Sequence, residues 1–322
     1  MKNFAITGVG GFIAPRHLQA IRDTGNRLLA ALDPHDAVGI LDRYFEDVAY
    51  FREFERFDRF VEKLRRKGDA ERVHYVSICT PNYLHDAHIR FALRVGADAI
   101  CEKPLVLNPW NLDALADLER ETGRRVFTVL QLRLHPSIVA LRERMARVPA
   151  GKVHDVDLTY ITSRGRWYGV SWKGDLERSG GIATNIGVHF FDMLSWIFGP
   201  VRDMAVHVAE PTRASGVLRL ERARVRWFLS LQRADLPEAA RAAGKTTFRS
   251  LAVEGEETEF SDGFADLHTA VYRDILAGGG FGIEDARPSI AMVHDIRVAA
   301  VSRSAPEDLH PFAARILGEK SS

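Results

Sequence analysis

Two side chains in this sequence have the right chemistry to move a proton and to stabilise the charge that the move creates. Lys103 directly follows a buried apolar run and precedes Pro104, which predicts a cation at the end of a strand. Such an ammonium can stabilise a developing alkoxide. His189 lies in the segment 179–192, and a neutral imidazole there can accept a hydroxyl proton. The alternatives are a surface lysine and a histidine that serves only the fold.

A glycine-rich turn near the start of the chain predicts a dinucleotide site. An apolar run from Phe4 leads into three closely spaced glycines, and a helix begins near Ala14. Strand, glycine turn and helix direct backbone N–H groups and a helix N-terminus at a pyrophosphate. Because Ile13 takes the third glycine position of the usual spacing, an ordinary strand–helix turn is the alternative. The residues expected to bind the cofactor in this turn are Gly8, Gly10, Gly11, Phe12 and Ile13.

Asp33 ends a second apolar run and indicates which dinucleotide binds. It lies 33 − 8 = 25 residues after Gly8, near the ~20 expected for the carboxylate that binds the adenosine ribose. A 2′-phosphate would be repelled by this carboxylate. The sequence therefore predicts NAD in preference to NADP.

Strands that alternate with helices in the first part of the chain predict a parallel, doubly wound sheet. Further strands are expected at 73–80, 97–101 and 126–130, and helices at 58–66, 84–95 and 109–121. Ligands of such a sheet bind beyond the carboxyl ends of its strands. The residues expected to contact NAD there are Thr80, Pro81, Asn82, His85, Glu102, Lys103 and Gln131.

The pattern changes near residue 150, beyond which alternation with period two predicts successive strands. These strands are expected near 153–162, 202–209, 216–232 and 247–260, followed by a late helix at 287–304. Strands without intervening helices favour an antiparallel sheet. We therefore expect an α/β protein with a nucleotide domain over 1–125. An α+β domain over 126–322 would have a large open, mostly antiparallel sheet, and its last helix would pack back on the first domain.

The segment 179–192 predicts an amphipathic helix that begins after two glycines. At about 100° per residue, Asn185, His189 and Asp192 fall on one face. Apolar residues cluster on another face, which is expected to pack on the core. No further His or Cys shows metal-ligand spacing, so no metal is expected.

The loop 163–178 is typical of a surface that binds an anionic substrate. It holds four cations, two anions and three aromatic residues. Arginines bind phosphate or carboxylate in a bidentate manner, and aromatic rings can stack on a base. The alternative is a solvated loop held by its aromatics. The residues expected to contact substrate here are Arg164, Trp167, Tyr168, Trp172 and Lys173.

The composition argues against several classes of function. The 322 residues predict two domains, and a net charge of +1 argues against a nucleic-acid or membrane-surface role. No run approaches ~20 apolar residues, so no membrane span is expected. Met1 leads almost directly into the first strand, which leaves no room for a signal peptide and favours the cytoplasm. Cys79 and Cys101 end apolar runs and are expected to be reduced and buried.

Three motifs in combination resemble the glucose–fructose oxidoreductase/inositol dehydrogenase/MocA family. They are Glu102-Lys103-Pro104, Gln131-x-Arg133-x-x-Pro136 and Gly180…Asn185-x-Gly187-x-His189-x-x-Asp192. The resemblance covers nearly the whole chain. It implies a Rossmann domain that binds NAD, an α/β domain with a large open sheet, and commonly a homotetramer. It also implies that Lys103 and His189 are catalytic and that Gln131, Arg133 and Asn185 contact substrate.

Within that family, the chain is most similar to the UDP-N-acetyl-2-amino-2-deoxyglucuronate 3-dehydrogenases of bacterial surface-polysaccharide (O-antigen) synthesis. The segments that carry this similarity are 11–17, 77–85, 160–165 and 183–189. The similarity implies a UDP-linked uronate substrate and hydride removal from C3 of its sugar. Some members regenerate bound NAD with a 2-oxo acid, so 2-oxoglutarate is a second candidate partner.

Asn185 departs from the broader family, where many members carry Asp at this position. An amide can hydrogen-bond substrate without adding a negative charge, but it cannot serve as a carboxylate proton relay. Two alternatives stay open: a dehydrogenase of a free sugar or inositol, and a non-catalytic dinucleotide sensor. A free sugar would give the basic, aromatic loop no role, and a sensor would need neither Lys103 nor His189.

Overall fold

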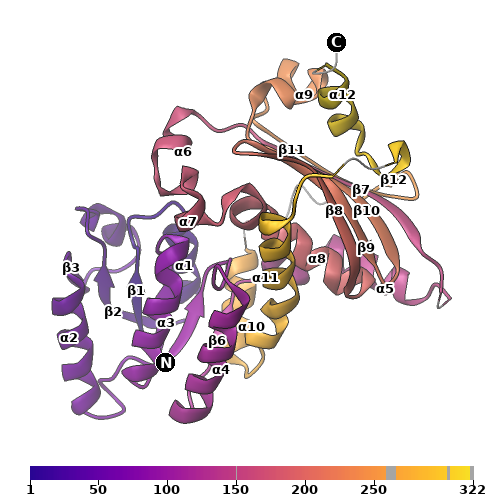
Figure 1. The fold of residues 1–322 in the computed structure, drawn as a ribbon. Helices are drawn as coiled ribbons and strands as arrows, with labels where there is room; N and C mark the ends of the chain where they lie inside the picture. The colour runs from indigo at the N-terminus through magenta and orange to yellow at the C-terminus, as the bar shows by residue number, and fades with distance from the viewer. Residues whose placement is uncertain (150, 259–265, 303–304, 320–322) are drawn as a thin grey trace. The chain divides into compact units, whose positions relative to one another are not determined.

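The chain divides into two compact units, each with its own sheet (Figure 1). The structure, a computed structural model, describes residues 1–149, 151–258, 266–302 and 305–319. The first unit comprises Met1–Gln131 with Ala265–Arg287, and the second comprises Leu132–Phe264 with Pro288–Ser322. The first division therefore lies 131 − 125 = 6 residues beyond the expected one, because residues 126–128 form a strand of the first sheet.

The first unit is built on a six-stranded, wholly parallel sheet, as the alternation of strands and helices predicted. Its strands, in the spatial order β3-β2-β1-β4-β5-β6, are Ala49–Phe51, Arg27–Leu32, Asn3–Thr7, Tyr75–Ile78, Asp98–Cys101 and Val126–Thr128. Every residue of β1 is buried, which accounts for its unbroken apolar run. The three-residue edge strand β3 was not predicted, because its residues are only half-buried and lie in a charged, aromatic segment.

Helices connect these strands and cover the sheet. They are α1 (Ala14–Asp23), α2 (Phe54–Arg66), α3 (His85–Arg94), α4 (Pro109–Thr122) and, from late in the chain, α10 (Leu267–Leu276). The returning helix α10 packs against α1, and the ring of Tyr272 stacks on Phe4 of β1. The sequence did not predict α10, because polar residues such as His268 and Thr269 are on its buried side and weaken its apolar stripe.

The second unit is built on a six-stranded mixed sheet, which confirms the mostly antiparallel sheet that was predicted. In the order β12-β11-β7-β10-β9-β8 the strands are Glu256–Glu257, Thr247–Val253, His154–Thr162, Ala223–Ser230, Arg213–Leu220 and Val201–Glu210. Among the six described strands of this sheet, β7 and β10 are the one pair that runs parallel. The stretch expected as one strand at 216–232 belongs to two strands, β9 and β10. Their connection, Glu221-Arg222, lacks the glycine or asparagine that marks most two-residue hairpins.

Helices pack on both faces of this second sheet. The helices of the unit are α5 (Pro136–Ala146), α6 (Arg166–Val170), α7 (Leu176–Ser179), α8 (Val188–Phe198), α9 (Glu238–Ala242) and α12 (Pro311–Glu319), while α11 (Ile283–Val298) begins in the first unit. On β10, Trp227 contacts Phe191 of α8, and its neighbour Phe228 stacks on Phe312 of α12. Strand β7, predicted to be half-solvated, is therefore mostly buried in its second half, where Thr159 hydrogen-bonds His310. Of the expected elements, residues 259–260 and 303–304 lie outside the described residues.

At Gly8, the glycine turn lies directly against the backbone that follows β4, and this close packing provides a test of the fold. The φ of Gly8 is +77°, and a Cβ atom there would lie 2.7 Å from backbone atoms of Cys79 and Thr80. Gly25 has a similar φ of +71° but open space around it. We expect Gly25→Ala to lower the free energy of unfolding by roughly 1–2 kcal/mol through backbone strain alone. Gly8→Ala should cost at least ~2 kcal/mol more, because backbone must also move. Urea unfolding of both variants would measure this; equal losses would contradict the packing role of Gly8.

Candidate functional site

The glycine turn between β1 and α1 forms an open groove in the first unit. The groove has a volume of about 570 Å³ and is lined by Val9, Gly10, Gly11, Phe12, Pro15, Asp36, Ala37, Gly39 and Ile40. Phe12 is 91% exposed beside it. Ile13 is the N-cap residue of α1 and makes no side-chain capping bond. The N–H groups of Ala14 and Arg16 donate to the carbonyls of Gly11 and Ile13, so α1 attracts a negative ligand through the positive end of its dipole. The turn therefore fits the pyrophosphate of a dinucleotide.

Asp33 lies directly after β2 and against the glycine turn. Its carboxylate accepts hydrogen bonds from the backbone N–H groups of Gly10, at 2.8 Å, and His35, at 3.0 Å. A Cβ on Gly10 would come within 3.0 Å of this carboxylate, so glycine is needed for the approach. Each carboxylate oxygen keeps a lone pair that can accept from a ribose hydroxyl. The geometry thus fits the role predicted for Asp33.

Several polar atoms at the carboxyl ends of the parallel strands are buried and lack a hydrogen-bond partner among the described residues. They are the Oγ1 atoms of Thr7, Thr80 and Thr128 and the Oε1 atom of Gln131. Buried polar groups are rarely left unpaired in folded proteins. A polar ligand at this edge of the sheet would satisfy such atoms, as expected for NAD at Thr80 and Gln131.

His85 bridges the two loops that follow β4 and β5. Its Nε2 lies 2.9 Å from the carbonyl oxygen of Thr80, and its Nδ1 lies 2.7 Å from that of Pro104. Burial lowers the pKa of His85, so the neutral ring donates to one of these carbonyls at a time. The same loop contains Pro81, which is partly buried, and Asn82, which is buried. His85, predicted to bind cofactor, thus fixes the backbone beside Lys103.

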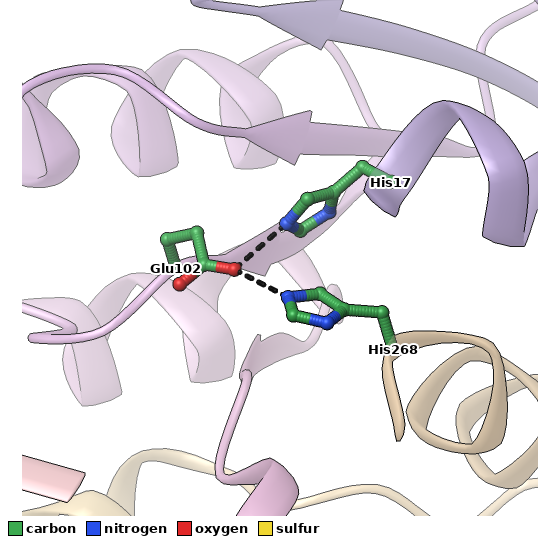
Figure 2. Close-up of side chains that lie close together, drawn as sticks. All are labelled: His17, Glu102 and His268. Carbon is green, nitrogen blue, oxygen red and sulfur yellow. Dashed lines mark hydrogen bonds and ion pairs between the residues drawn. The ribbon is translucent and has the colours of Figure 1, made fainter. Parts of the chain in front are cut away.

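Glu102 is buried and contacts two histidines, as Figure 2 shows. Its Oε1 atom lies 2.9 Å from Nε2 of His17 on α1 and 2.9 Å from Nε2 of His268 on α10. Burial alone would raise the pKa of Glu102, but the hydrogen bonds from both histidines hold it well below its usual range. Burial lowers the pKa of His17 despite the carboxylate. The cluster therefore contains an ionised carboxylate and a neutral His17.

Neither cysteine has the character of a nucleophile. Cys79 and Cys101 are both free and buried, as predicted. Burial raises the pKa of each thiol well above its usual value, so the reactive thiolate is scarce.

In the second unit, the segment predicted as one amphipathic helix is a π-helical turn, Ala183–Gly187, followed by α8. Such π turns are frequent at functional sites. A Cβ on Gly187 would lie 2.7 Å from side-chain atoms of Leu229 and Phe191, so glycine lets the turn approach β10. Asn185 and His189 are partly buried. The glycine at 187 thus lets the turn that carries Asn185, and the start of the helix that carries His189, lie against β10.

Asp192 does not present a free carboxylate, although its place on the predicted polar face suggested one. It is buried and accepts from Arg133 at 3.0 Å (Nε) and 2.7 Å (Nη2). The two side chains are only 3% and 7% exposed. The pair therefore connects the start of the second unit to α8, the helix that carries His189. Arg133, predicted to bind substrate, contributes at least part of its hydrogen-bonding capacity to this ion pair.

The basic, aromatic loop carries the remaining predicted substrate residues. Nδ2 of Asn185 donates to the hydroxyl oxygen of Tyr168. Burial raises the pKa of Tyr168, and burial together with the nearby Arg164 lowers the pKa of Lys173. Arg164 itself is exposed, Trp167 is 69% exposed and Trp172 is partly buried. The structure thus brings Tyr168 and Asn185 together and leaves cationic and aromatic groups accessible.

The predicted site residues are divided between the two units, and the structure places further residues near them that the sequence did not predict. Lys103 belongs to the first unit and His189 to the second. The groove residues Asp36, Ala37, Gly39 and Ile40 come shortly after the end of β2, so their position after a strand could have predicted them. His268 and Tyr272 lie far along the chain, and no local pattern marks them. Among the described residues, no helix combines the length and apolar character needed to span a membrane.

Comparison with known proteins identifies both parts of the chain. Residues 2–130 match the family described as "Oxidoreductase family, NAD-binding Rossmann fold", and residues 150–235 match its "C-terminal alpha/beta domain". The curated proteins that the chain matches include inositol 2-dehydrogenase of Rhizobium meliloti, which is 27% identical over 199 residues. The aligned segments cover 36%, 37% and 54% of the length of three such relatives.

Solved structures give fuller matches. The WlbA (WbpB) dehydrogenase of Thermus thermophilus is 52% identical to this chain, and the match covers 97% of this chain and 100% of that one. Two structures of that enzyme superpose with TM-scores of 0.94 and 0.93. One contains NAD and alpha-ketoglutarate, and the other NAD and UDP-GlcNAcA. The WlbA dehydrogenase of Bordetella pertussis, at 19% identity, covers 92% and 94% of the two chains with a TM-score of 0.74, which shows a shared fold.

The buried Arg133–Asp192 pair gives a prediction on the stability of the second unit. Asp192→Ala should cost roughly 3–5 kcal/mol, because Arg133 would keep its charge in the interior without this carboxylate. The exposed pair of Arg120 and Asp117 is the control, and Asp117→Ala should change stability by less than about 1 kcal/mol. Replacing both partners, as Arg133→Met with Asp192→Leu, should recover much of the loss. Denaturant unfolding measures the free energy of unfolding of all three variants. Equal losses of stability in Asp192→Ala and Asp117→Ala would contradict the stabilising role of the buried ion pair.

Proposed function

This chain belongs to the GFO/IDH/MocA oxidoreductase family, and on that premise we propose that it is an NAD-dependent dehydrogenase of a UDP-linked uronate. The reaction is oxidation of the sugar C3 hydroxyl of UDP-N-acetyl-2-amino-2-deoxyglucuronate to the 3-keto sugar. One observation carries the proposal: the 52% identity, over 97% of this chain, to an enzyme whose structure contains NAD and UDP-GlcNAcA. An identity this high over both units favours a shared substrate class as well as a shared fold.

The residues of the first unit support the use of NAD. The glycine turn, the helix N-terminus and the Asp33 carboxylate suit a pyrophosphate and an unphosphorylated ribose. Bound NAD supplies the acceptor for the hydride that leaves C3. The ammonium of Lys103 would stabilise negative charge on the C3 oxygen as its proton departs. The imidazole of His189 would accept that proton, so the alcohol loses one proton and one hydride in total.

The second unit supports an anionic nucleotide sugar as substrate. Arg164 and Lys173 supply positive charge, and Trp167 and Trp172 supply aromatic faces that a base can stack on. The Asn185 amide and the Tyr168 hydroxyl, already in contact, can hydrogen-bond sugar hydroxyls without adding negative charge. These groups suit a diphosphate and a uronate carboxylate better than a neutral free sugar.

Three further features are part of the proposal. A 2-oxo acid such as 2-oxoglutarate would regenerate NAD in place, as suggested by the alpha-ketoglutarate in the Thermus structure. We also propose a homotetramer and a place in surface-polysaccharide synthesis, where an aminotransferase would use the 3-keto product. The homotetramer rests on the resemblance to the family, in which tetramers are common, and the place in synthesis rests on the similarity to the UDP-N-acetyl-2-amino-2-deoxyglucuronate 3-dehydrogenases.

A dehydrogenase of a free sugar or inositol is the second candidate, since inositol 2-dehydrogenase is among the relatives. Purified protein should be incubated with NAD and a panel of UDP-sugars, UDP-uronates, free sugars and inositol, with and without 2-oxoglutarate. Reduced cofactor is followed by absorbance, and the 3-keto product by mass spectrometry, because recycling would hide the absorbance change. Turnover of UDP-N-acetyl-2-amino-2-deoxyglucuronate supports the proposal. Turnover restricted to inositol or a free sugar would replace it with the second candidate.

His189→Asn should abolish most turnover while NAD binding and the melting temperature stay near those of the wild type. Loss of a positioned base typically costs ~10²–10⁴ in rate. Because a protonated imidazole cannot accept a proton, the wild-type rate should fall at acid pH, and the variant's residual rate should lose this dependence. Steady-state kinetics over pH test this. Near-normal turnover with the same acid dependence would assign the proton acceptor elsewhere, and unfolding would make His189 a structural residue.

Arg164→Ala should raise the Michaelis constant for a UDP-uronate ten- to a hundredfold and change that for a neutral UDP-sugar much less. A charge-assisted hydrogen bond is worth roughly 1.5–3 kcal/mol, which corresponds to this range. Arg166→Ala is the matched control, since Arg166 is exposed in the same loop and lies 4.7 Å from the Trp167 ring centroid. Equal losses on both substrates would assign Arg164 to the diphosphate or to the fold.

A further inference from the structure

The three side chains in Figure 2 form one buried cluster within the first unit, although they come from three distant segments. His17 lies on α1, Glu102 follows β5, and His268 lies on α10. All three are buried, and both histidines contact the same carboxylate oxygen at 2.9 Å. The cluster therefore brings α10 and α1 to the residue that precedes Lys103.

The protons of this cluster can be placed from its contacts. Nδ1 of His17 lies 2.8 Å from the hydroxyl of Tyr272, which lies 2.6 Å from the hydroxyl of Ser77. If Ser77 donates to Tyr272 and Tyr272 donates to His17, the Nε2 atom of His17 carries the proton that Glu102 accepts. His268 then donates its Nε2 proton to the same oxygen. In this arrangement each of these contacts joins one donor to one acceptor, and the Glu102 carboxylate accepts from both rings.

The other oxygen of Glu102 reaches the proposed catalytic residue. Its Oε2 accepts from the backbone N–H of Lys103 at 3.3 Å. On the far side of Lys103, the carbonyl of Pro104 contacts His85 at 2.7 Å. Three buried histidines therefore hold the segment 102–104, two through the Glu102 carboxylate and one through a carbonyl. The backbone that carries the Lys103 side chain is constrained before and after it.

We propose that His17 and His268 are positioning residues for Lys103, acting through the shared Glu102 carboxylate. This inference rests on the proposed function in giving Lys103 its catalytic role. Without one of these donors the carboxylate can turn, and the Lys103 N–H loses its fixed acceptor. A displacement of about 1 Å at a catalytic group can cost as much as ~10² in rate.

A divalent metal is the competing occupant, because two imidazoles and a carboxylate are a known ligand set. The ligand atoms lie within 4.8 Å of one another. Binding through Nε2 would put the proton of His268 on Nδ1, which has no hydrogen-bond partner among the described residues. Histidines that bind metal almost always donate this proton to an acceptor. The geometry therefore favours a cluster held by hydrogen bonds over a metal site.

The test uses His268→Leu, which removes the donor, and His268→Gln, whose amide can replace the Nε2–H group. His88→Leu is the matched control, since His88 is also buried in the first unit but packs against Phe54 and forms no hydrogen bond or ion pair with residues 102–104 in the described structure. We expect His268→Leu to lower kcat about ten- to a hundredfold on the UDP-uronate, with KM and NAD affinity within about threefold of the wild type. His268→Gln should restore most of kcat, and His88→Leu should leave it unchanged.

A second readout needs no substrate. The acylation rate of the Lys103 amine by an activated ester is measured by peptide mass spectrometry, in wild type and variants with NAD bound. If the wild type turns over no UDP-sugar but His268→Leu alone changes this rate, the proposed function fails and the positioning role stands. Unchanged kcat and unchanged acylation in His268→Leu would overturn the positioning role, as would equal effects of His88→Leu. Stoichiometric zinc in the purified wild type, absent from both His268 variants, would replace the inference with a metal site.

Discussion

A buried, ionised carboxylate in the first unit constrains much of what surrounds it. An unpaired charge in a protein interior is very costly, so Glu102 must be surrounded by donors. Those donors come from His17, His268 and the backbone of Lys103. His268 can supply its proton only if α10 packs against α1. This requirement offers a physical reason why the late segment Ala265–Arg287, which contains α10, belongs to a unit otherwise made from the first 131 residues.

The second unit uses buried polar contacts in a similar way. The pair of Arg133 and Asp192 connects the start of that unit to α8, and Gly187 lets the preceding π turn lie against β10. In both units, the segment with a proposed catalytic residue is held by buried groups that need not touch substrate themselves. Rigid support of this kind lets a site keep its geometry at little entropic cost when substrate binds.

Much of the architecture could be predicted from the sequence, because it depends on patterns within a few residues. Unbroken apolar runs in β1 and β2, with a helix between them, identify a parallel sheet, and alternation with period two identifies the strands of the second sheet. The elements that were missed have weak local patterns. Strand β3 is short and half-buried, the turn between β9 and β10 lacks the usual residues, and α10 buries polar side chains.

The sequence by itself determined the two kinds of sheet, the glycine turn with Asp33, and the short motifs around Lys103 and His189. Each of these features depends only on residues that are close together in the sequence. Only the tertiary structure decided what the side chains within those motifs contact. On helical spacing, Asp192 is equivalent to Asn185 and His189, yet it is buried against Arg133, 59 residues away in sequence. His268 carries no local signal and meets Glu102 across 166 residues. A buried charge selects partners by distance in space, and spacing along the chain does not encode that distance.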